Sequence, residues 1–323
     1  RIPNIARAND GTLIAVAEAR LFGASDPGGT HIDLVYKRSF DGGKTWSAGR
    51  VLDRHPDTIL DGNDVPTNRT SASNSVTFVN RATGRIWNLN LRLPNATPAA
   101  SAQPGVDDMQ TWARYSDDSG ATWSTPTRIL GNTGAIPYED FYPNLGSATQ
   151  LSSGRLVVPA TEIVPAARSR SFARDSNEVG AAWSAGASRD AGTNKGQVIS
   201  NDSGATWEPT YVGFSSTTVM EAIERYTSSG VDGESINRLL HTRPAGGSVH
   251  SRTNLEILTA TDETEPGGPT FGSNRRVIHG WSAYSDLVNI DGDEFGVFWE
   301  RGDTGNNQKI TYTRANRAFL EPG

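Results

Sequence analysis

The opening residues of the chain carry three groups that could do chemistry together. Arg1 and Arg20 supply two guanidinium groups, and Asp26 supplies a carboxylic acid in a glycine-rich stretch. Planar guanidinium groups bind carboxylates through paired hydrogen bonds and stay charged at any working pH. A protonated carboxylic acid can donate its proton to a leaving oxygen, and a partly desolvated loop would raise its pKa to suit that task. We therefore expect Asp26 to meet further functional groups from later in the chain.

The elements that position these groups are short strands joined by a recurring turn. The pattern Ser-x-Asp-x-Gly-x-Thr-Trp occurs at Ser39–Trp46, Ser116–Trp123 and Ser200–Trp207, each time after an alternating strand. In such a turn the Asp caps backbone N–H groups, the Gly adopts a positive φ, and the Thr and Trp pack against the neighbouring strand. We assign this turn a structural role, because a calcium loop needs more carboxylates than it carries.

The spacing of the turns predicts the architecture. Repeats of roughly 50 residues with about four short strands each are typical of propeller blades. Six such blades fit the 323 residues, with the last closed by the strand at Lys309–Arg314 beside the first segment. We predict an all-β chain that forms a single six-bladed β-propeller domain over residues 1–323, with the turns away from the functional site. Four of the five tryptophans outside the turns are expected mainly in the core, namely Trp112, Trp183, Trp281 and Trp299.

Composition excludes several classes of function. The formal charge of −6 and a pI near 5.4 argue against a nucleic-acid surface, and no basic run occurs. No apolar stretch approaches the ~20 residues that cross a bilayer. The chain has no cysteine, and its five histidines show no metal-binding spacing, so we expect neither disulfides nor a metal. The chain begins on Arg1 without a methionine, so we expect a processed or trimmed protein. We also expect it to be secreted and monomeric and to use no cofactor.

Several motifs together resemble the exo-sialidases of bacteria and fungi, a family of retaining glycoside hydrolases on a six-bladed propeller. The resemblance spans nearly the whole chain and includes the three turns, which correspond to the family's Asp-boxes. The other matching segments are Arg1–Pro3, Ala15–Arg20, Arg225–Ser228, Arg238–Leu240, Ser251–Leu255, Ser282–Leu287 and Val297–Gly302.

The resemblance implies roles for individual residues. Arg1, Arg189 and Arg252 would clamp the substrate carboxylate, with Arg20 as a further substrate-binding or loop-bracing residue. Tyr284 would be the nucleophile, Glu178 its partner base, and Asp26 the acid/base.

Glu178 and Arg189 have a rival pair. In the family an Asn-Glu dipeptide begins a hairpin that ends at an arginine before the next Asp-box strand, and this hairpin is about five residues shorter here. Glu221 with Arg243 is the alternative, but that segment already matches another family motif.

The chemistry of a sialoside explains why these residue types are needed. Its anomeric carbon carries a carboxylate, which three arginines would bind and which would repel an anionic nucleophile. A neutral phenol avoids that repulsion if a carboxylate takes its proton, an exception to the usual pair of carboxylates in glycoside hydrolases. The implied substrate is a sialylated glycan or glycoconjugate.

Other functions remain open at this point. Asp-boxes also occur in carbohydrate-binding propellers without activity, although such a binder has no need to keep both Asp26 and Tyr284. An arabinan-cleaving propeller would use paired carboxylates and no arginine triad. A hydrolase of the related 2-keto acid Kdn and a sialyl transferase would use the same site.

Overall fold

The computed structural model describes most of the first, fifth and sixth blades and parts of the others. The described residues are 1–93, 110–129, 141–143, 145–150, 154, 156–162, 170–176, 183–190, 195–197, 212–214, 217, 219–231, 233–246, 251–262, 269–272 and 274–321.

The described strands follow one another in the order predicted for a six-bladed propeller and form five sheets, because one parallel pair, Ile32 with Ser71, joins the strands of blades 1 and 2. Blade 1 contains β1 (Asn4–Arg7), β2 (Leu13–Arg20), β3 (Ile32–Ser39) and β4 (Arg50–Asp53). Blade 2 contains β5 (Ser71–Val79), β6 (Ile86–Leu93), β7 (Gln110–Ser116) and β8 (Thr127–Arg128). Blade 3 contains β9 (Phe141–Pro143), β10 (Thr149–Gln150), β11 (Leu156–Glu162), β12 (Arg170–Ser176) and β13 (Trp183–Asp190). Blade 4 is described by β14 (Lys195–Gln197) and β15 (Val212–Phe214).

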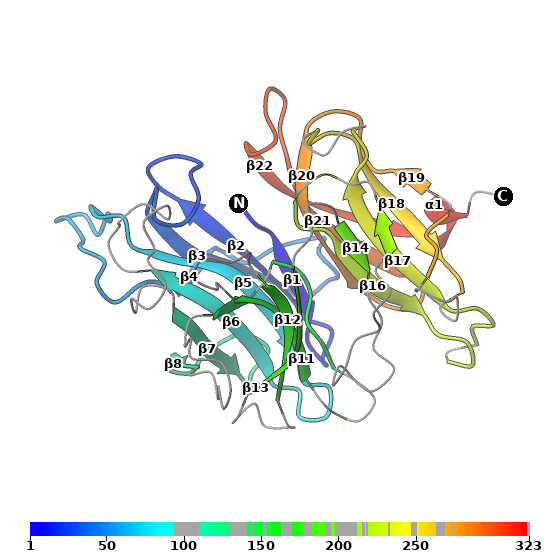
Figure 1. Ribbon diagram of the computed structural model, residues 1–323, viewed down its shortest axis with the longest axis horizontal. Helices are drawn as coiled ribbons and strands as arrows, with labels where there is room; N and C mark the ends of the chain where they lie inside the picture. The colour runs from blue at the N-terminus through cyan, green and yellow to red at the C-terminus, as the bar shows by residue number, and fades with distance from the viewer. Residues whose placement is uncertain are drawn as a thin grey trace.

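The last two blades complete the ring. Blade 5 contains β16 (Ala222–Thr227), β17 (Arg238–Pro244), β18 (Leu255–Ala260) and β19 (Asn274–Arg276). Blade 6 contains β20 (Ser282–Asn289), β21 (Glu294–Arg301) and β22 (Lys309–Asn316), followed by the short helix α1 (Arg317–Leu320). Figure 1 shows blades 1 to 3 on one side and blades 5 and 6 on the other, with β1 and the N-terminus between them.

Antiparallel pairing places the segments of Arg1, Asp26, Arg252 and Tyr284 at one end of the sheets. Arg20 pairs with Ile32, so the loop 21–31 lies at the end of blade 1 where the chain begins. The backbone N–H of Ile2 donates to Glu300, and that of Ser282 donates to the carbonyl of Arg252. We call this the site end of the propeller.

The Asp-boxes lie at the opposite end, as predicted. In the first box, Asp41 accepts hydrogen bonds from the Thr45 hydroxyl at 2.6 Å, the Thr45 backbone N–H at 2.9 Å and the Ser39 hydroxyl at 2.8 Å. These bonds hold the pKa of Asp41 well below its usual range. The second box, around Asp118, repeats the same contacts. The third box, residues 200–207, lies outside the described residues.

The core is divided among the interfaces between neighbouring blades. Ile14, Leu34 and Ile86 pack between blades 1 and 2, and Tyr226 and Phe295 pack between blades 5 and 6. Further clusters lie between blades 2 and 3 and between blades 6 and 1. Blades 1, 2 and 6 are therefore each stabilised by apolar area that they bury against both neighbours.

The tryptophan predictions are confirmed for the described boxes and for Trp299 and wrong for Trp281. Trp112 is half-buried, with Arg92 over its ring, and the side chain of Trp183 is not described. Trp123 meets Tyr36 edge to face with ring centroids 6.0 Å apart. Trp299 is buried in the core, as expected. Trp281 is 42% exposed, because it precedes β20 at the site end, beyond the sheet that would cover it.

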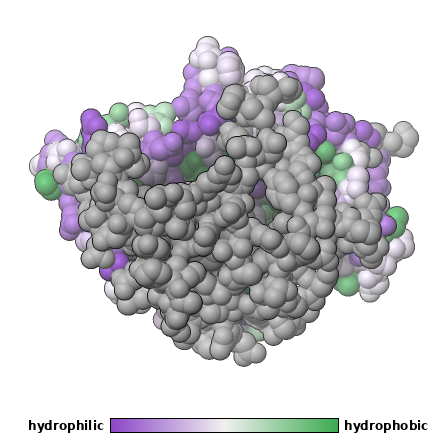
Figure 2. All heavy atoms as spheres, viewed as in Figure 1, coloured by the Kyte–Doolittle hydropathy of each residue, from purple (hydrophilic) through white to green (hydrophobic). Residues whose placement is uncertain are grey.

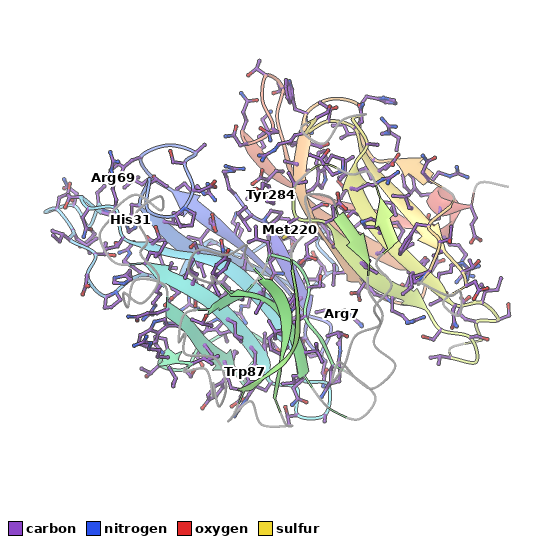
Figure 3. All side chains as sticks on the ribbon, in the orientation of Figure 1. Arg7, His31, Arg69, Trp87, Met220 and Tyr284 are labelled. Carbon is purple, nitrogen blue, oxygen red and sulfur yellow. The ribbon has the colours of Figure 1, made fainter. Side chains whose placement is uncertain are left out.

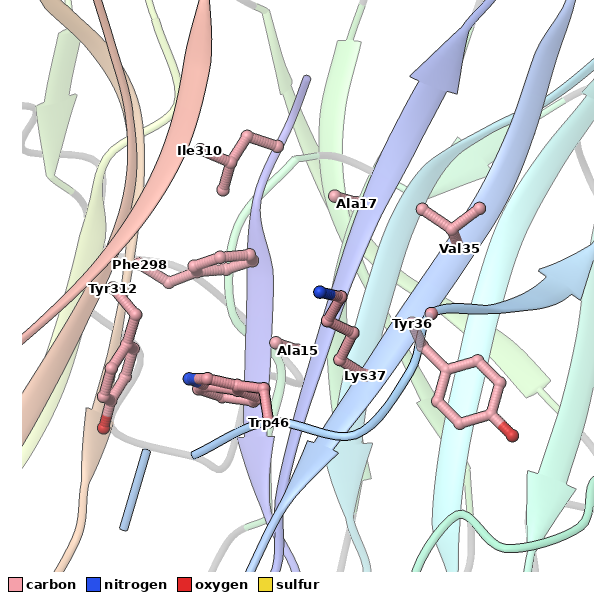
Figure 4. A pocket seen from close by; sticks show the side chains of 10 residues that line it. Ala15, Ala17, Val35, Tyr36, Lys37, Trp46, Phe298, Ile310 and Tyr312 are labelled. Carbon is pink, nitrogen blue, oxygen red and sulfur yellow. The ribbon is translucent and has the colours of Figure 1, made fainter. Parts of the chain in front are cut away.

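Blades 6 and 1 meet without sharing a strand among the described residues. Trp46 and Tyr312 pack edge to face across this joint, with centroids 5.2 Å apart. Beside them lies an apolar pocket of about 310 Å³ between β2, β3, β21 and β22 (Figure 4). Its floor includes Ala15, Ala17 and Phe298, and the small side chains leave this space unfilled.

The surface seen in Figure 2 is hydrophilic around much of its upper edge, where the site-end loops lie. Within the part of the chain that the structure describes, no helix has the length and apolar character needed to span a membrane.

Candidate active site

Tyr284 lies at the centre of the candidate site, where two arginines approach its ring. It belongs to β20, at an irregularity in the pairing with β21 between Ser282 and Ser285. The guanidinium carbons of Arg1 and Arg252 are each 5.5 Å from the centroid of its ring. Figure 3 places Tyr284 near the N-terminus, between the two groups of blades. The structure thus brings together three residues that the sequence predicted to share one site.

Glu300 holds Arg1 in place. Its Oε1 accepts from Nε of Arg1 at 3.3 Å and from the backbone N–H of Ile2 at 2.8 Å. Glu300 is fully buried, and its Oε2 has no hydrogen-bond partner among the described residues. Glu300 belongs to the segment 297–302 that resembles a family motif, but the sequence alone did not predict a role for it. The signal that could have pointed to it is its place at the end of β21, the strand next to that of Tyr284.

Arg20 binds its own loop. Its Nε donates to Glu18 at 2.8 Å, and its other nitrogens bind Glu18 and Asp26, the latter at 3.1 Å. It also donates to the carbonyls of Ala24 and Ser25 at 2.8 and 2.7 Å. All three guanidinium nitrogens of Arg20 are therefore engaged, which fits the loop-bracing alternative. Substrate binding by Arg20 stays a prediction.

Asp26 projects from the loop that Arg20 braces. Its side chain is 81% exposed, so the partly desolvated setting that we expected is not what the structure shows. The loop closes on itself through the Gly29 N–H, which donates to the Asp26 carbonyl at 2.9 Å. Gly28 between them has a φ of 88°, a conformation that glycine adopts without strain.

The electrostatic setting of Tyr284 disfavours spontaneous ionisation. Burial raises the pKa of its phenol above the ordinary value, and the positive charges of Arg252 and Arg1 oppose that shift. The negative charges of Asp26 and Glu300 add to the rise. The phenol is therefore protonated at neutral pH and needs a base to act as a nucleophile.

The predicted base and the third arginine are not placed by the structure. Glu178 lies outside the described residues, and Arg189 lies on β13, opposite Ser171, with a side chain that is not described. In the rival pair, Glu221 contacts His241 at 3.0 Å, and Arg243 contacts Glu256 at 2.9 Å, all within blade 5. Both assignments stay predictions.

The described part of the chain contains no cluster of three or more His, Asp or Glu side chains arranged for a metal ion. The groups gathered at the site end are two guanidinium groups beside a phenol and a carboxyl on a facing loop. Such a set can bind a small carboxylate and carry out proton transfer and nucleophilic attack.

Comparison with known proteins identifies the family of this chain. The model for the BNR repeat-like domain matches residues 11–265, which is most of the chain. The chain belongs to this family. The sialidase of Micromonospora viridifaciens is 25% identical over an alignment that covers 99% of this chain and 52% of that protein. The sialidase of Paraclostridium sordellii is 25% identical over 64% of this chain and 57% of its own length. The chain thus spans about half the length of these two curated relatives.

Solved structures support the fold of this BNR repeat-like protein. The Hadza microbial sialidase Hz136 has a TM-score of 0.84 at 21% identity, over 99% of this chain and 66% of its own. The intramolecular trans-sialidase of Ruminococcus gnavus has a TM-score of 0.78 at 18% identity, over 99% and 95%. The predicted propeller and the resemblance to sialidases are confirmed.

Proposed function

We propose that the chain is the catalytic propeller of a retaining exo-α-sialidase, which removes terminal sialic acid from glycoconjugates through a covalent tyrosyl intermediate. The observation that carries this proposal is the approach of Arg1 and Arg252 to the ring of Tyr284. We further propose that the protein is secreted and acts as a monomer.

The arginines would bind the carboxylate on the anomeric carbon. A bidentate guanidinium–carboxylate pair fixes both charge and orientation, which a lysine at the same place would not do. With the carboxylate held by Arg1 and Arg252, the anomeric carbon would lie over the phenol of Tyr284. Arg189 is the proposed third member of this clamp.

Tyr284 would attack the anomeric carbon while a carboxylate, proposed to be Glu178, takes the phenolic proton. The C–O bond to the leaving group breaks as the new bond to the phenolic oxygen forms, with inversion. Water then displaces the phenolate with a second inversion, so the configuration is retained overall. The positive charges of Arg1 and Arg252 beside the ring favour the phenolate form that leaves in this step.

Asp26 would donate a proton to the leaving oxygen in the first step and take one from water in the second. Its exposure leaves room for a sugar to lie against it. Arg20, which holds the loop, would keep the carboxyl aimed at the cleft.

Proton NMR of the first turnovers tests the proposal. An α-sialoside should release the α-anomer of sialic acid first, before mutarotation produces the β-anomer. Early β-anomer would refute retention, and an absence of release from every sialoside would favour a carbohydrate-binding propeller. Parallel reactions with N-acetylneuraminic acid and Kdn glycosides, with the products identified, separate the two sugar preferences and distinguish hydrolysis from transfer.

A further inference from the structure

The N-terminal strand is attached to the last blade by side chains. β1 pairs only with β2, and the strands of blade 6 pair among themselves. Arg1 precedes β1, whereas Tyr284 lies on β20. The distance between these two residues therefore depends on contacts that cross the joint between blades 6 and 1.

On the strand of Tyr284, Asp286 makes several of these contacts. Its Oδ2 accepts from the Asn4 side-chain amide and from the Ile5 backbone N–H, both at 2.8 Å. Its Oδ1 accepts from the Ser147 hydroxyl at 2.7 Å and from the Leu287 backbone N–H at 2.9 Å. One carboxylate thus joins blade 6 to β1 and to the segment that precedes β10.

Asn4 extends this connection to a further blade. Its Oδ1 accepts from the backbone N–H of Thr77 on β5 at 2.6 Å. Asn4 and Asp286 are both fully buried. The four donors around Asp286 require an acceptor on both oxygens, which a carboxylate supplies and a carboxamide cannot.

Asp286 lies two residues beyond Tyr284 on β20, just past the irregularity in the pairing with β21. The intervening Ser285 is also fixed, because its hydroxyl donates to Thr242 at 2.9 Å. The strand is therefore held at both residues that follow Tyr284. A shift of Asp286 would move Tyr284 relative to β1.

Stability alone does not account for a carboxylate at this place. Burial raises the pKa of Asp286 to about 6 in spite of its hydrogen bonds, which shows that the charged form is costly there. Buried ionic groups are often no more stabilising than apolar side chains of similar size, and some of them serve to fix one arrangement.

We propose that Asp286 is a positioning residue that sets the placement of Arg1 against Tyr284 by holding β1 to β20. It does not touch the substrate. The effect on the affinity for a sialic acid analogue rests on the proposed sialidase function, whereas the effect on the titration of Tyr284 does not.

Titration of Tyr284 by NMR in protein labelled with 13Cζ-tyrosine tests the placement directly. Tyr284→Phe assigns the signal. In Asp286→Asn, Arg1 should move away from the ring, and the pKa of Tyr284 should rise by about half a unit or more, because a positive charge that lowers it is removed. The affinity for the 2,3-unsaturated analogue of sialic acid should fall roughly 10- to 100-fold, as expected for a misplaced binding group.

Asp53→Asn is the matched control. Asp53 is equally buried and binds Asn90, Arg92 and Arg114, but it lies between blades 1 and 2. The Asp53→Asn variant should have lower thermal stability than wild type. Its Tyr284 titration should be unchanged, and its affinity for the analogue should stay within about twofold of wild type.

Asn4→Ala and Ser147→Ala each remove one donor and provide the test if Asp286→Asn does not fold. Asn4→Ala should change the titration of Tyr284 in the same direction by a smaller amount.

An unchanged titration and affinity in the folded variants would overturn the proposal. If wild type releases no sialic acid from any substrate, the proposed function fails, and the Tyr284 titration still decides the role of Asp286.

Discussion

At the scale of single residues, the site is defined by charges placed around one phenol. Arg1 and Arg252 lie at equal distances from the ring of Tyr284, and Asp26 belongs to a separate loop. Binding and proton donation therefore rest on different segments of the chain. Substitutions in the two segments should affect different kinetic quantities.

Arg252→Ala should weaken binding of a carboxylate ligand. The loss should be about 2–5 kcal/mol, the range for removing one partner of a hydrogen-bonded charge pair. Isothermal titration calorimetry with the unsaturated analogue measures it at fixed salt. Arg314→Ala, at the opposite end of the propeller beside Glu294, is the control and should bind as wild type. An affinity for Arg252→Ala within twofold of wild type would show that Arg252 does not contact the carboxylate.

Asp26→Ala should make the rate depend on the leaving group. A sialoside with a poor leaving group needs the proton, so its kcat/KM should fall by roughly 10²- to 10⁴-fold. An aryl sialoside with an acidic phenol should lose far less. Steady-state kinetics with the two substrates gives the ratio, and equal losses for both would contradict a role as general acid.

At the scale of elements, the Asp-boxes hold the ends of the blades opposite the site. Ser119 in the second box donates to Asp10 in the turn between β1 and β2 at 2.6 Å, so the box also joins two blades. The described Asp-boxes therefore close the ends of strands and connect neighbouring blades, but they place no side chain at the site. Changes in a box should therefore alter stability and leave catalysis intact.

Thr122→Val should destabilise the protein at neutral pH without loss of activity, and the difference from wild type should shrink in acid. Burial acts to raise the pKa of Asp118, but hydrogen bonds from Thr122 and Ser116 outweigh it and hold the pKa at about 2. This carboxylate contributes stability above an ordinary aspartate pKa of about 4, and the contribution is lost as the pH falls through about 2. In the variant this contribution is smaller, so its stability should depend less on pH between about 2 and 5.

Thermal unfolding midpoints between pH 2 and 5 measure this effect. At neutral pH the variant should unfold a few degrees lower than wild type, with kcat/KM within about twofold. A large loss of activity in folded Thr122→Val would place the box in the site and contradict its structural role.

At the scale of the whole molecule, the sequence predicted what depends on local patterns. The boxes could be predicted from their closely spaced Ser, Asp, Gly and Trp residues, because each described box is closed by hydrogen bonds within its own turn. Tyr284 and Arg252 were found through motif context. Glu300 and Asp286 could not be given roles, because their partners Arg1 and Asn4 lie at the other end of the chain and meet them only when the ring closes. The exposure of Trp281 likewise depends on the tertiary structure, because no neighbouring strand covers the end of β20 that it precedes.

Glu224→Gln should remove a pH-dependent loss of stability. Burial and the charge of Asp286 raise the pKa of Glu224 to about 7, in spite of the opposing charge of Arg81. A raised carboxyl pKa favours the native state below the unfolded value of about 4.3, and this advantage is lost as the pH rises through about 7. The native state should therefore lose on the order of 2 kcal/mol from this group between pH 5 and 8.

Urea unfolding of wild type and Glu224→Gln at these two pH values measures the difference, which should be smaller in the variant. Glu321→Gln is a control of opposite sign, because Arg238 lowers the pKa of Glu321 and its contribution is lost only in acid. Equal pH dependence in wild type and Glu224→Gln would show that Glu224 titrates normally.

Covalent trapping on Tyr284 tests the central claim most directly. A 3-fluoro sialyl fluoride reacts through its good leaving group, and the fluorine slows the second displacement, so the intermediate accumulates. Peptide mass spectrometry should find the sugar on Tyr284 in wild type and no adduct in Tyr284→Phe, which should lose most turnover and still bind the unsaturated analogue. An adduct on another residue, or full turnover by Tyr284→Phe, would contradict the account.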